Sequence, residues 1–461
     1  MKDPASAFPQ NIADTIARHS LLPRGAKVMV ALSGGSDSVA LLLSLRALGY
    51  DVSAAHFNFR LRGVESLRDE QFVRTLCNRL GIVLHVESQN ARAYAAAHGV
   101  SIEMAAREMR YGFFASLVSA TSIPVAVAHH ADDNIETVFL SLLRGTGLRG
   151  LTGMRYRAVM TFGGCPITVI RPMLDVSRAD VLAYLSAIGQ DYVTDSTNQE
   201  DDVKRNMIRL DVLPSLCRIN PSYRETLRGD IYRFSEMYKI YAEAVRGYLR
   251  HVTTGPYGDR LLSKNVLRSC PSPEALLYEW LSPYGFHSAQ IHDMLLSRTA
   301  FPRRYLPAEN KGGGEFVLYE EQNRFVLCDD RSLADIPPMT LPESGCCRYG
   351  ELAIEVSELH DMPSHEELRN PACAFIDIDK LCGRLTIRRI KSGDRMRPFG
   401  MKGTKLVNDI MAAQKAGVVD RLRQTVVVSG DIIVWLTGRR TAADVAVSVD
   451  TRHILRLSII G

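Results

Sequence analysis

Apolar residues in the first part of the chain form short β-branched runs that alternate with longer stretches of helical period. The run KVMVAL at 27–32 is followed by a Gly/Ser turn and an apolar stretch that indicates a helix. Further strands are predicted at 51–56, 82–86 and 125–128, and further helices at 65–80, 102–119 and 132–143. This alternation predicts a parallel sheet covered by helices on both faces.

The order of these elements also predicts where a ligand binds. In open parallel sheets, ligands lie at the carboxyl ends of the strands. The polar segments that follow three of the predicted strands, 33–38, 56–62 and 129–133, should therefore share one cleft.

After Pro214 the pattern changes. Residues 221–250 look helical, further short helices are expected at 260–300, and short β runs dominate from about 385 onward, with one helix near 405–417. We therefore predict three domains: a Rossmann-like α/β domain with a parallel sheet at 1–218, a mostly helical middle domain at 219–340, and a small α+β domain at 341–461.

Composition and charge narrow the class of protein. No stretch reaches the roughly 18 consecutive apolar residues of a membrane span, and the N-terminus lacks an apolar signal core, which favours a cytoplasmic protein without membrane contact. The nine cysteines include no C-x-x-C pair and are expected to be free thiols. Residues 384–461 carry 15 Lys+Arg against 6 Asp+Glu, which predicts contact with a polyanion such as RNA.

A short polar loop follows the first predicted strand and opens the first helix of this region. It consists of Ser33, Gly34, Gly35, Ser36, Asp37 and Ser38. The two glycines permit a sharp turn, and the helix N-terminus and serine hydroxyls suit a phosphate that Mg²⁺ on Asp37 would also contact. The alternative is a loop whose Ser or Asp only caps the helix.

This loop resembles the PP-loop, S-G-G-x-D-S, of the N-type ATP pyrophosphatases. It lacks the Lys of a G-x-x-x-x-G-K-[ST] loop and the spacing of G-x-G-x-x-G. The resemblance implies that the N-terminal domain is a PP-loop ATP pyrophosphatase domain that binds ATP and releases pyrophosphate.

Two further segments place charged side chains at the predicted cleft. Arg107 and Arg110 share one helical face with Glu103. Their guanidinium groups would stabilise negative charge on a phosphate. The alternative is that they form an exposed ion pair with Glu103 on the helix. Asp133 and Glu136, at i and i+3, would bind Mg²⁺ or a cationic amine, with helix capping as the alternative. A glycine-rich segment with interleaved arginines at 143–154 suits a mobile loop near a polyanion.

Taken together, these segments resemble the tRNA(Ile)-lysidine synthase family. The resemblance is carried by HFNFRLRG (56–63), AAREMRY (105–111), HHADDNIETV (129–138), LLRGTGLRGLTGM (142–154), RPMLDVSR (171–178) and DSTNQEDDVKRNMIRLDVLP (195–214). It is dense over about 25–215 and resumes more loosely in the basic C-terminal segment with KSGDRMRPFG, GTKLVNDI and VWLTGRR.

The resemblance implies an ATP-dependent carbon–nitrogen ligase. ATP would adenylate the C2 oxygen of the wobble cytidine in the tRNA(Ile) with a CAU anticodon, and the ε-amine of L-lysine would then displace AMP. The product, lysidine, pairs with A instead of G and changes the codon read from AUG to AUA. The family also implies a possible homodimer, and residues 384–461 are expected to read the acceptor arm of the tRNA.

The resemblance also implies a role for each candidate residue. Asp37 and the loop would hold ATP and Mg²⁺, with Asp133 as a second candidate for the metal, and Arg107 or Arg110 would contact the reacting phosphate. Asp133 and Glu136 would recognise or deprotonate the lysine amine. Arg205 and Arg209 would lie nearby, on the tRNA or on the lysine carboxylate.

Three other functions are weighed against this one. A tRNA thiolation enzyme with a PP-loop would be expected to use cysteines, often as C-x-x-C, and an amidating synthetase would need an amidotransferase partner or an N-terminal nucleophilic Cys; neither signal is present. A tRNA-binding scaffold without activity would be unexpected with an intact loop and the Asp133/Glu136 pair.

Overall fold

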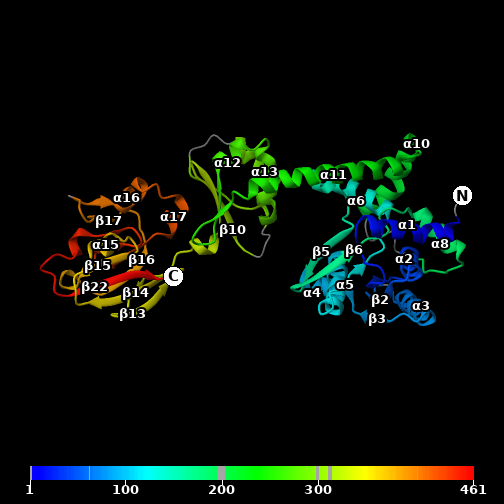
Figure 1. Cartoon of the computed structure of the whole chain (residues 1–461), viewed down its shortest axis with the longest axis horizontal. Coiled ribbons are helices and arrows are strands. Elements are labelled where there is room, and N and C mark those ends of the chain that lie inside the picture. Colours follow the sequence, from blue (N-terminus) through cyan, green and yellow to red (C-terminus); the bar gives the residue numbers. More distant parts are fainter. Residues whose placement is uncertain are drawn as a thin grey trace. The chain divides into compact units, whose positions relative to one another are not determined.

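The structure is a computed structural model that describes residues 3–61, 63–194, 203–296, 301–309, 314–401 and 403–460 (Figure 1). The chain divides into two compact units, Met1–Tyr241 (unit 1) and Ala242–Gly461 (unit 2). Parts of two quoted motifs, Arg62 and residues 195–202, lie outside the described residues. The predicted domain limits at 218 and 340 stay predictions.

Unit 1 is built around a six-stranded sheet with the order β3-β2-β1-β4-β6-β5. Its strands are β1 (Lys27–Ala31), β2 (Asp51–Asn58), β3 (Leu84–Ser88), β4 (Val125–Ala126), β5 (Arg157–Phe162) and β6 (Cys165–Ile170). All neighbours pair in parallel except β5, which is antiparallel to β6 at the edge. This arrangement confirms the predicted α/β class.

Helices cover both faces of this sheet. They are α1 (Pro4–Arg18), α2 (Ser36–Ala47), α3 (Val64–Leu80), α4 (Ala91–His98), α5 (Ile102–Val118), α6 (Ala131–Leu143), α7 (Leu148–Leu151) and α8 (Arg178–Ala187). Along β1 the side chains alternate between faces: Val28 and Val30 pack with α1, α2, α3 and α8, whereas Met29 packs with α4 and α5. The continuous apolar run of β1 therefore reflects burial on both sides.

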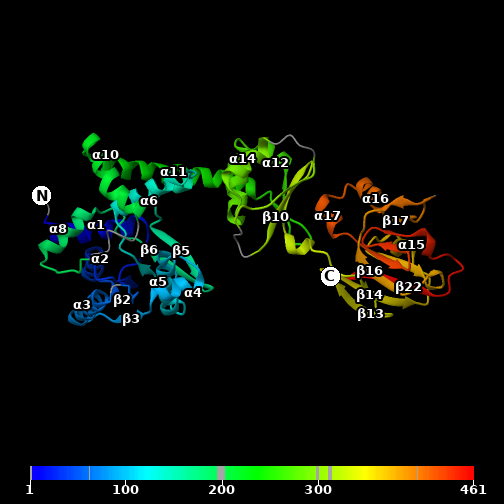
Figure 2. The ribbon, with the colours of Figure 1, turned by 180° about the vertical axis from the view of Figure 1, so that it is seen from behind.

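A helical segment follows on the C-terminal side of this sheet domain. It comprises α9 (Val203–Met207), a π-helical turn (Ile208–Val212), α10 (Leu213–Ile219) and α11 (Tyr223–Leu249), which contains the boundary between the units. Ile208, Leu213 and Tyr223 pack on Ile135 and Val138 of α6. This contact holds the π-helical turn against α6, the helix that follows β4 in sequence. Figure 2 shows α6 beside α11.

Unit 2 begins with a five-stranded antiparallel sheet in the order β7-β8-β11-β10-β9. Its elements are β7 (Thr253–Thr254), β8 (Arg260–Ser263), α12 (Lys264–Ser269), α13 (Pro273–Leu281), α14 (Ser288–Leu296), β9 (Arg303–Tyr305), β10 (Phe316–Glu320) and β11 (Arg324–Asp329). The expected short helices are thus present, together with more strand than the sequence pattern indicated.

Two further sheets share one core at the C-terminal end of unit 2. One contains β12 (Met339–Thr340), β16 (Leu385–Arg389), β19 (Thr425–Ser429), β20 (Ile432–Leu436) and β21 (Arg440–Thr441). The other contains β13 (Gly345–Tyr349), β14 (Leu352–Leu359), β15 (Cys373–Asp377) and β22 (Ile454–Ile460). Short helices, α15 (His365–Arg369), α16 (Val407–Ala413) and α17 (Val418–Arg423), and a ribbon of β17 (Arg395–Met396) with β18 (Lys405–Leu406) complete this part.

The basic segment 384–461 contributes strands to both of these sheets. Its strand β22 pairs with both β14 and β15, and β16 pairs with β12. Removing the segment would therefore break both sheets, so it is not a detachable arm. All nine cysteines are free thiols, as expected. No helix among the described residues is long and apolar enough to cross a membrane.

Candidate active site

Hydrogen bonds to the hydroxyl of Ser38 hold the Ser33–Ser38 loop in a tight turn. Ser38 Oγ accepts hydrogen bonds from the backbone N–H groups of Ser33 and Gly34, both at 3.2 Å, and donates to the carbonyl oxygen of Gly35 at 3.0 Å. The carbonyl oxygen of Gly34 accepts from the Val193 N–H at 2.9 Å, which ties the loop to the chain after α8. The turn is thus fixed before any ligand arrives.

The first turn of α2 is available to an anion. Gly35 is the N-cap residue, and no side chain caps this end of the helix. The leading amides of an α-helix have no partner within the helix, and together with the helix dipole they attract negative charge. The capping alternative weighed for this loop is therefore not what the structure has.

Replacing Gly34 by alanine should damage this loop, whereas the same change at Gly35 should not. Gly34 has φ +94°, and a Cβ there would lie 3.2 Å from Val73 Cγ2; at Gly35 the nearest atom would be Ser33 Oγ at 3.5 Å. A strained backbone of this kind costs about 1–3 kcal/mol, and if the loop relaxes away from its phosphate-binding shape, ATP should bind about tenfold more weakly. Calorimetric titration of ATP into wild type, Gly34→Ala and Gly35→Ala measures this; equal affinities for the two variants would contradict it.

The loop after β4 meets this loop because β1 and β4 are neighbours in the sheet. His130, which is 1% exposed and caps α6, lies between them: its Nε2 is 4.0 Å from Asp37 Oδ2, and its Nδ1 is 3.5 Å from Asp133 Oδ2. His56, near the carboxyl end of β2, bonds through Nδ1 to the carbonyl oxygen of Leu32 at 2.8 Å. The segments 33–38 and 129–133 therefore meet through His130 at the carboxyl ends of β1 and β4, as predicted, whereas a cleft shared with 56–62 stays a prediction.

Asp133 caps α6, which was one of the roles weighed for it, and also forms an ion pair with Arg209. One carboxylate oxygen accepts from the backbone N–H of His130 at 3.0 Å, which completes a capping box. The other lies 3.4 Å from Arg209 Nη2. The Asp133 side chain is partly exposed, so its carboxylate is still accessible to a ligand.

Glu136 is a fully buried carboxylate whose two oxygens are both occupied. Arg205 Nε donates to Oε2 at 2.9 Å, and Arg209 donates from Nε to Oε1 at 2.7 Å and from Nη2 to Oε2 at 3.0 Å. Burial lowers the pKa of Arg209, but the hydrogen bond and charge of Glu136 outweigh it, and the pKa is raised. In this geometry Glu136 positions two guanidiniums and leaves no oxygen open to an amine.

Arg107 and Arg110 lie against the same aromatic ring. Their guanidinium carbons are 5.0 and 5.3 Å from the centre of Tyr111, within the range of a cation–π contact. Burial lowers the pKa of Arg110, Tyr111 acts in the opposite direction, and Arg107 lowers it again. No salt bridge joins Glu103 to either arginine among the contacts of the described residues, so the exposed ion pair weighed for this helix is absent there.

Two functional candidates were not assigned a role from the sequence, Arg171 and His129. Arg171 is 8% exposed at the end of β6 and donates from Nε to His129 Nδ1 at 3.2 Å and from Nη1 to the Arg155 carbonyl oxygen at 2.8 Å. Arg171 directly follows β6 and His129 lies three residues after β4, so the rule that ligands bind at the carboxyl ends of strands could have found them.

The hydrogen bond from Arg171 indicates that His129 is neutral, with its proton on Nε2. Burial, as the largest cause, lowers its pKa to about 4; Asp133 opposes this, whereas Arg171, Arg110 and Arg205 add to it. Since the unfolded value is about 6.5, the unfolded chain binds a proton between pH 6.5 and 4 that the folded chain does not.

Stability should therefore fall as the pH drops from about 6.5 toward 4, by up to about 1.4 kcal/mol per pH unit from this group. The contribution is complete above pH 6.5. In His129→Gln this part of the pH dependence should be missing. Urea unfolding of both proteins at a series of pH values measures it, and parallel curves would argue against a neutral His129.

The glycine-rich segment is held against α6. It contains α7, and the Met154 N–H donates to Asn134 Oδ1 at 2.6 Å. Gly153 has φ +63°, and a Cβ there would collide with the same oxygen. One glycine of this segment is thus required by close packing on the helix that carries Asp133 and Glu136.

Comparisons with known proteins agree with this geometry. Residues 6–216 match the PP-loop domain family, and residues 258–302 match the TilS substrate binding domain family. A tRNA(Ile)-lysidine synthase of Bacteroides thetaiotaomicron is 38% identical over 98% of this chain and 99% of its own length. One of Parabacteroides distasonis is 37% identical over 97% of this chain and 98% of its own length.

Among solved structures, a TilS C-terminal domain aligns at 22% identity over 27% of this chain and 95% of that chain, with a TM-score of 0.25. The full-length relatives are decisive, because their identity extends over nearly all of both chains. The chain belongs to the tRNA(Ile)-lysidine synthase family.

Proposed function

We propose that this chain is an ATP-dependent ligase that joins L-lysine to C2 of the wobble cytidine of tRNA(Ile) with a CAU anticodon, giving lysidine. The full-length similarity to tRNA(Ile)-lysidine synthases carries the proposal. The geometry of the site also supports the proposal. The uncapped start of α2 suits a phosphate, and the nearby carboxylates of Asp37 and Asp133 suit a cation.

In the first step the C2 oxygen of the cytidine attacks the α-phosphorus of ATP, and pyrophosphate leaves. The amides at the start of α2 and the hydroxyls of the loop would hold the leaving group. Arg107, Arg110 and Arg171 have no carboxylate partner within the described part of the chain. They would therefore be free to stabilise negative charge on the α-phosphate.

Mg²⁺ would be held by Asp37. The described residues contain no group of three His, Cys, Asp or Glu side chains that could bind a metal by themselves. Mg²⁺ commonly takes one or two carboxylates and completes its shell with phosphate oxygens and water, and Asp37 in the first turn of α2 fits that pattern. Both oxygens of Asp133 already have partners, so its role as a metal ligand stays a prediction.

In the second step the ε-amine of lysine attacks C2, and the C2–O bond breaks to release AMP. Asp133 would bind the ammonium group and accept its proton through Oδ1, because the contact of this oxygen with Arg209 Nη2, at 3.4 Å, is longer than the contacts of 2.7–3.0 Å that hold both oxygens of Glu136. Arg205 and Arg209, held by Glu136, would face the lysine carboxylate or the tRNA backbone. The family also favours a homodimer, which we retain as a prediction.

Exchange of labelled pyrophosphate into ATP tests the first step without lysine. The tRNA(Ile) transcript should support exchange, and a transcript with uridine in place of the wobble cytidine should not. Uridine keeps the C2 oxygen but has a proton on N3 and an oxygen in place of the C4 amino group, so its C2 oxygen is a weaker nucleophile. Exchange that needs no tRNA, or none with either transcript, would contradict adenylation of this base; the latter would favour a tRNA-binding scaffold without activity.

A further inference from the structure

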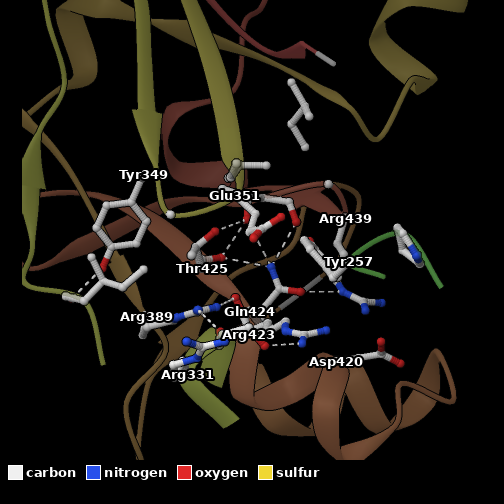
Figure 3. Close-up of a pocket in the computed structure, with 18 residues that line it drawn as sticks. Tyr257, Arg331, Tyr349, Glu351, Arg389, Asp420, Arg423, Gln424, Thr425 and Arg439 are labelled. Atoms are coloured by element: carbon white, nitrogen blue, oxygen red, sulfur yellow. Dashed lines mark hydrogen bonds between the residues drawn. The ribbon is translucent and has the colours of Figure 1, made fainter. Parts of the chain in front are cut away.

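Unit 2 contains a pocket of about 490 Å³ that the proposed chemistry does not use (Figure 3). This volume lies in the range of sites for small molecules or for one nucleotide-sized group. The charged residues in its wall are four arginines and two carboxylates: Arg331, Arg389, Arg423, Arg439, Glu351 and Asp420. They come from both the β7–β11 sheet region and the C-terminal sheets.

Several of these charges are already neutralised within unit 2. Arg423 forms a buried ion pair with Asp259, with Nη2 2.9 Å from Oδ1. Asp420 accepts from the Gly417 N–H at 3.0 Å and from Arg324 Nη2 at 3.2 Å. Arg331 pairs with Asp329, and Glu351 is exposed, where water and salt screen its charge.

Arg389 forms no such ion pair with a described residue, and the charge of Asp335 acts on it more weakly than Tyr349 and Arg423 do. It donates to the backbone oxygens of Arg423 and Ser332, and its Nε is buried without an acceptor among the described groups. Burial lowers the pKa of Arg389, Tyr349 acts in the opposite direction, and Arg423 lowers it again. A bound anion would supply the missing partner.

Arg439 faces the pocket from the turn after β20. Its Nε donates to Gln424 Oε1 and its Nη1 to Gln414 Oε1, both at 2.7 Å, and both acceptors are neutral amides. Figure 3 shows Arg389 beside Arg331 and Arg423, with Arg439 next to Gln424. Neither Arg389 nor Arg439 forms a salt bridge with any residue that the structure describes.

We propose that this pocket binds a phosphate ester group through Arg389 and Arg439. A guanidinium without a carboxylate partner offers paired N–H donors that match phosphate oxygens. The volume admits the sugar attached to the phosphate as well as the phosphate itself. An RNA phosphate and a free nucleotide share this chemistry; the choice of RNA as the source rests on the proposed function and on the basic segment 384–461.

The test uses the full-length chain with Arg389→Gln, Arg439→Gln, and Arg369→Gln as a matched control. Arg369 is exposed on α15 outside the pocket, so its replacement changes the net charge equally. Binding of a tRNA(Ile) transcript is measured over a salt series, and inorganic phosphate and AMP are titrated separately without RNA.

Each pocket variant should bind the transcript about tenfold more weakly, with the slope of log affinity against log salt reduced by about one. The Arg369→Gln protein should behave like wild type. If phosphate or AMP binding weakens in the pocket variants but transcript binding does not, the pocket takes a free anion and RNA is the wrong source. If all three probes bind the pocket variants and Arg369→Gln alike, the proposal is overturned.

Arg389→Gln also removes hydrogen bonds to the backbone, so each variant is first checked by thermal melting. Arg439→Gln, whose partners are side-chain amides, carries the test if Arg389→Gln does not fold. Absence of lysidine formation by wild type would defeat the proposed function but leave the phosphate titrations unchanged, so the two failures are distinguishable.

Discussion

Replacing Glu136 by alanine is expected to lower the stability of unit 1 by about 3 kcal/mol and to abolish the proposed activity. The carboxylate is 0% exposed and accepts three hydrogen bonds from Arg205 and Arg209. Removing one partner of a buried ion pair costs about 3–5 kcal/mol, and we take the lower end because the two arginine side chains are each 31% exposed. The guanidiniums would then repel each other across an empty site.

Thermal melting measures the effect, with an expected fall of about 6–12 °C in the melting temperature of unit 1. Asp230→Ala is the matched control, because it removes a carboxylate from an ion pair with Arg233 that is exposed on α11. Exposed pairs contribute about 0–1 kcal/mol, so this variant should melt close to wild type. Similar melting of the two variants would contradict the structural role of Glu136.

Replacing Asp133 by alanine is expected to reduce lysidine formation by about 100-fold or more. A group that accepts a proton in the reacting complex typically contributes about 10²–10⁴ in rate, and Asp133 is the carboxylate proposed to meet the lysine amine. Loss of the capping box should add a stability cost of about 0.5–2 kcal/mol, because the His130 N–H loses its acceptor.

Asp133→Asn separates these two contributions. Its amide oxygen can still accept from the His130 N–H, so α6 should keep its start, but the negative charge is gone. Lysine incorporation into the tRNA(Ile) transcript should therefore fall in both variants, whereas only alanine should lower the melting temperature. Near-wild-type turnover by Asp133→Asn would assign Asp133 to capping and remove it from the chemistry.

The sequence predicted the parts of unit 1 that depend on local pattern. The apolar run of β1 and the Ser/Gly turn after it identify a strand, a loop and a helix, and neighbouring parallel strands then place Asp37 and Asp133 together. The β5–β6 hairpin was not predicted, although Gly163 and Gly164, both with positive φ, form its turn. Two adjacent glycines between apolar runs are a usable hairpin signal.

The pairing of charged side chains could not be predicted in the same way. Glu136 meets Arg205 and Arg209 about seventy positions later because α6 packs on the π-helical turn, and that contact depends on tertiary packing rather than on spacing. Likewise, the excess of Lys and Arg over Asp and Glu in 384–461 indicated contact with an anion. It did not indicate that Arg423 is neutralised by Asp259, or that Arg389 forms no ion pair with a carboxylate. Such partners lie far apart in the sequence, and no helical or strand spacing relates their positions.

The most direct test of the central claim is mass spectrometry of a tRNA(Ile) transcript with a CAU anticodon after incubation with the protein, ATP, Mg²⁺ and L-lysine. The anticodon fragment should gain the mass of lysine less one water, located on the wobble cytidine, and the gain should require both ATP and lysine. An unchanged fragment, or the same gain at another nucleotide, would contradict the assignment of this chain as the ligase that forms lysidine.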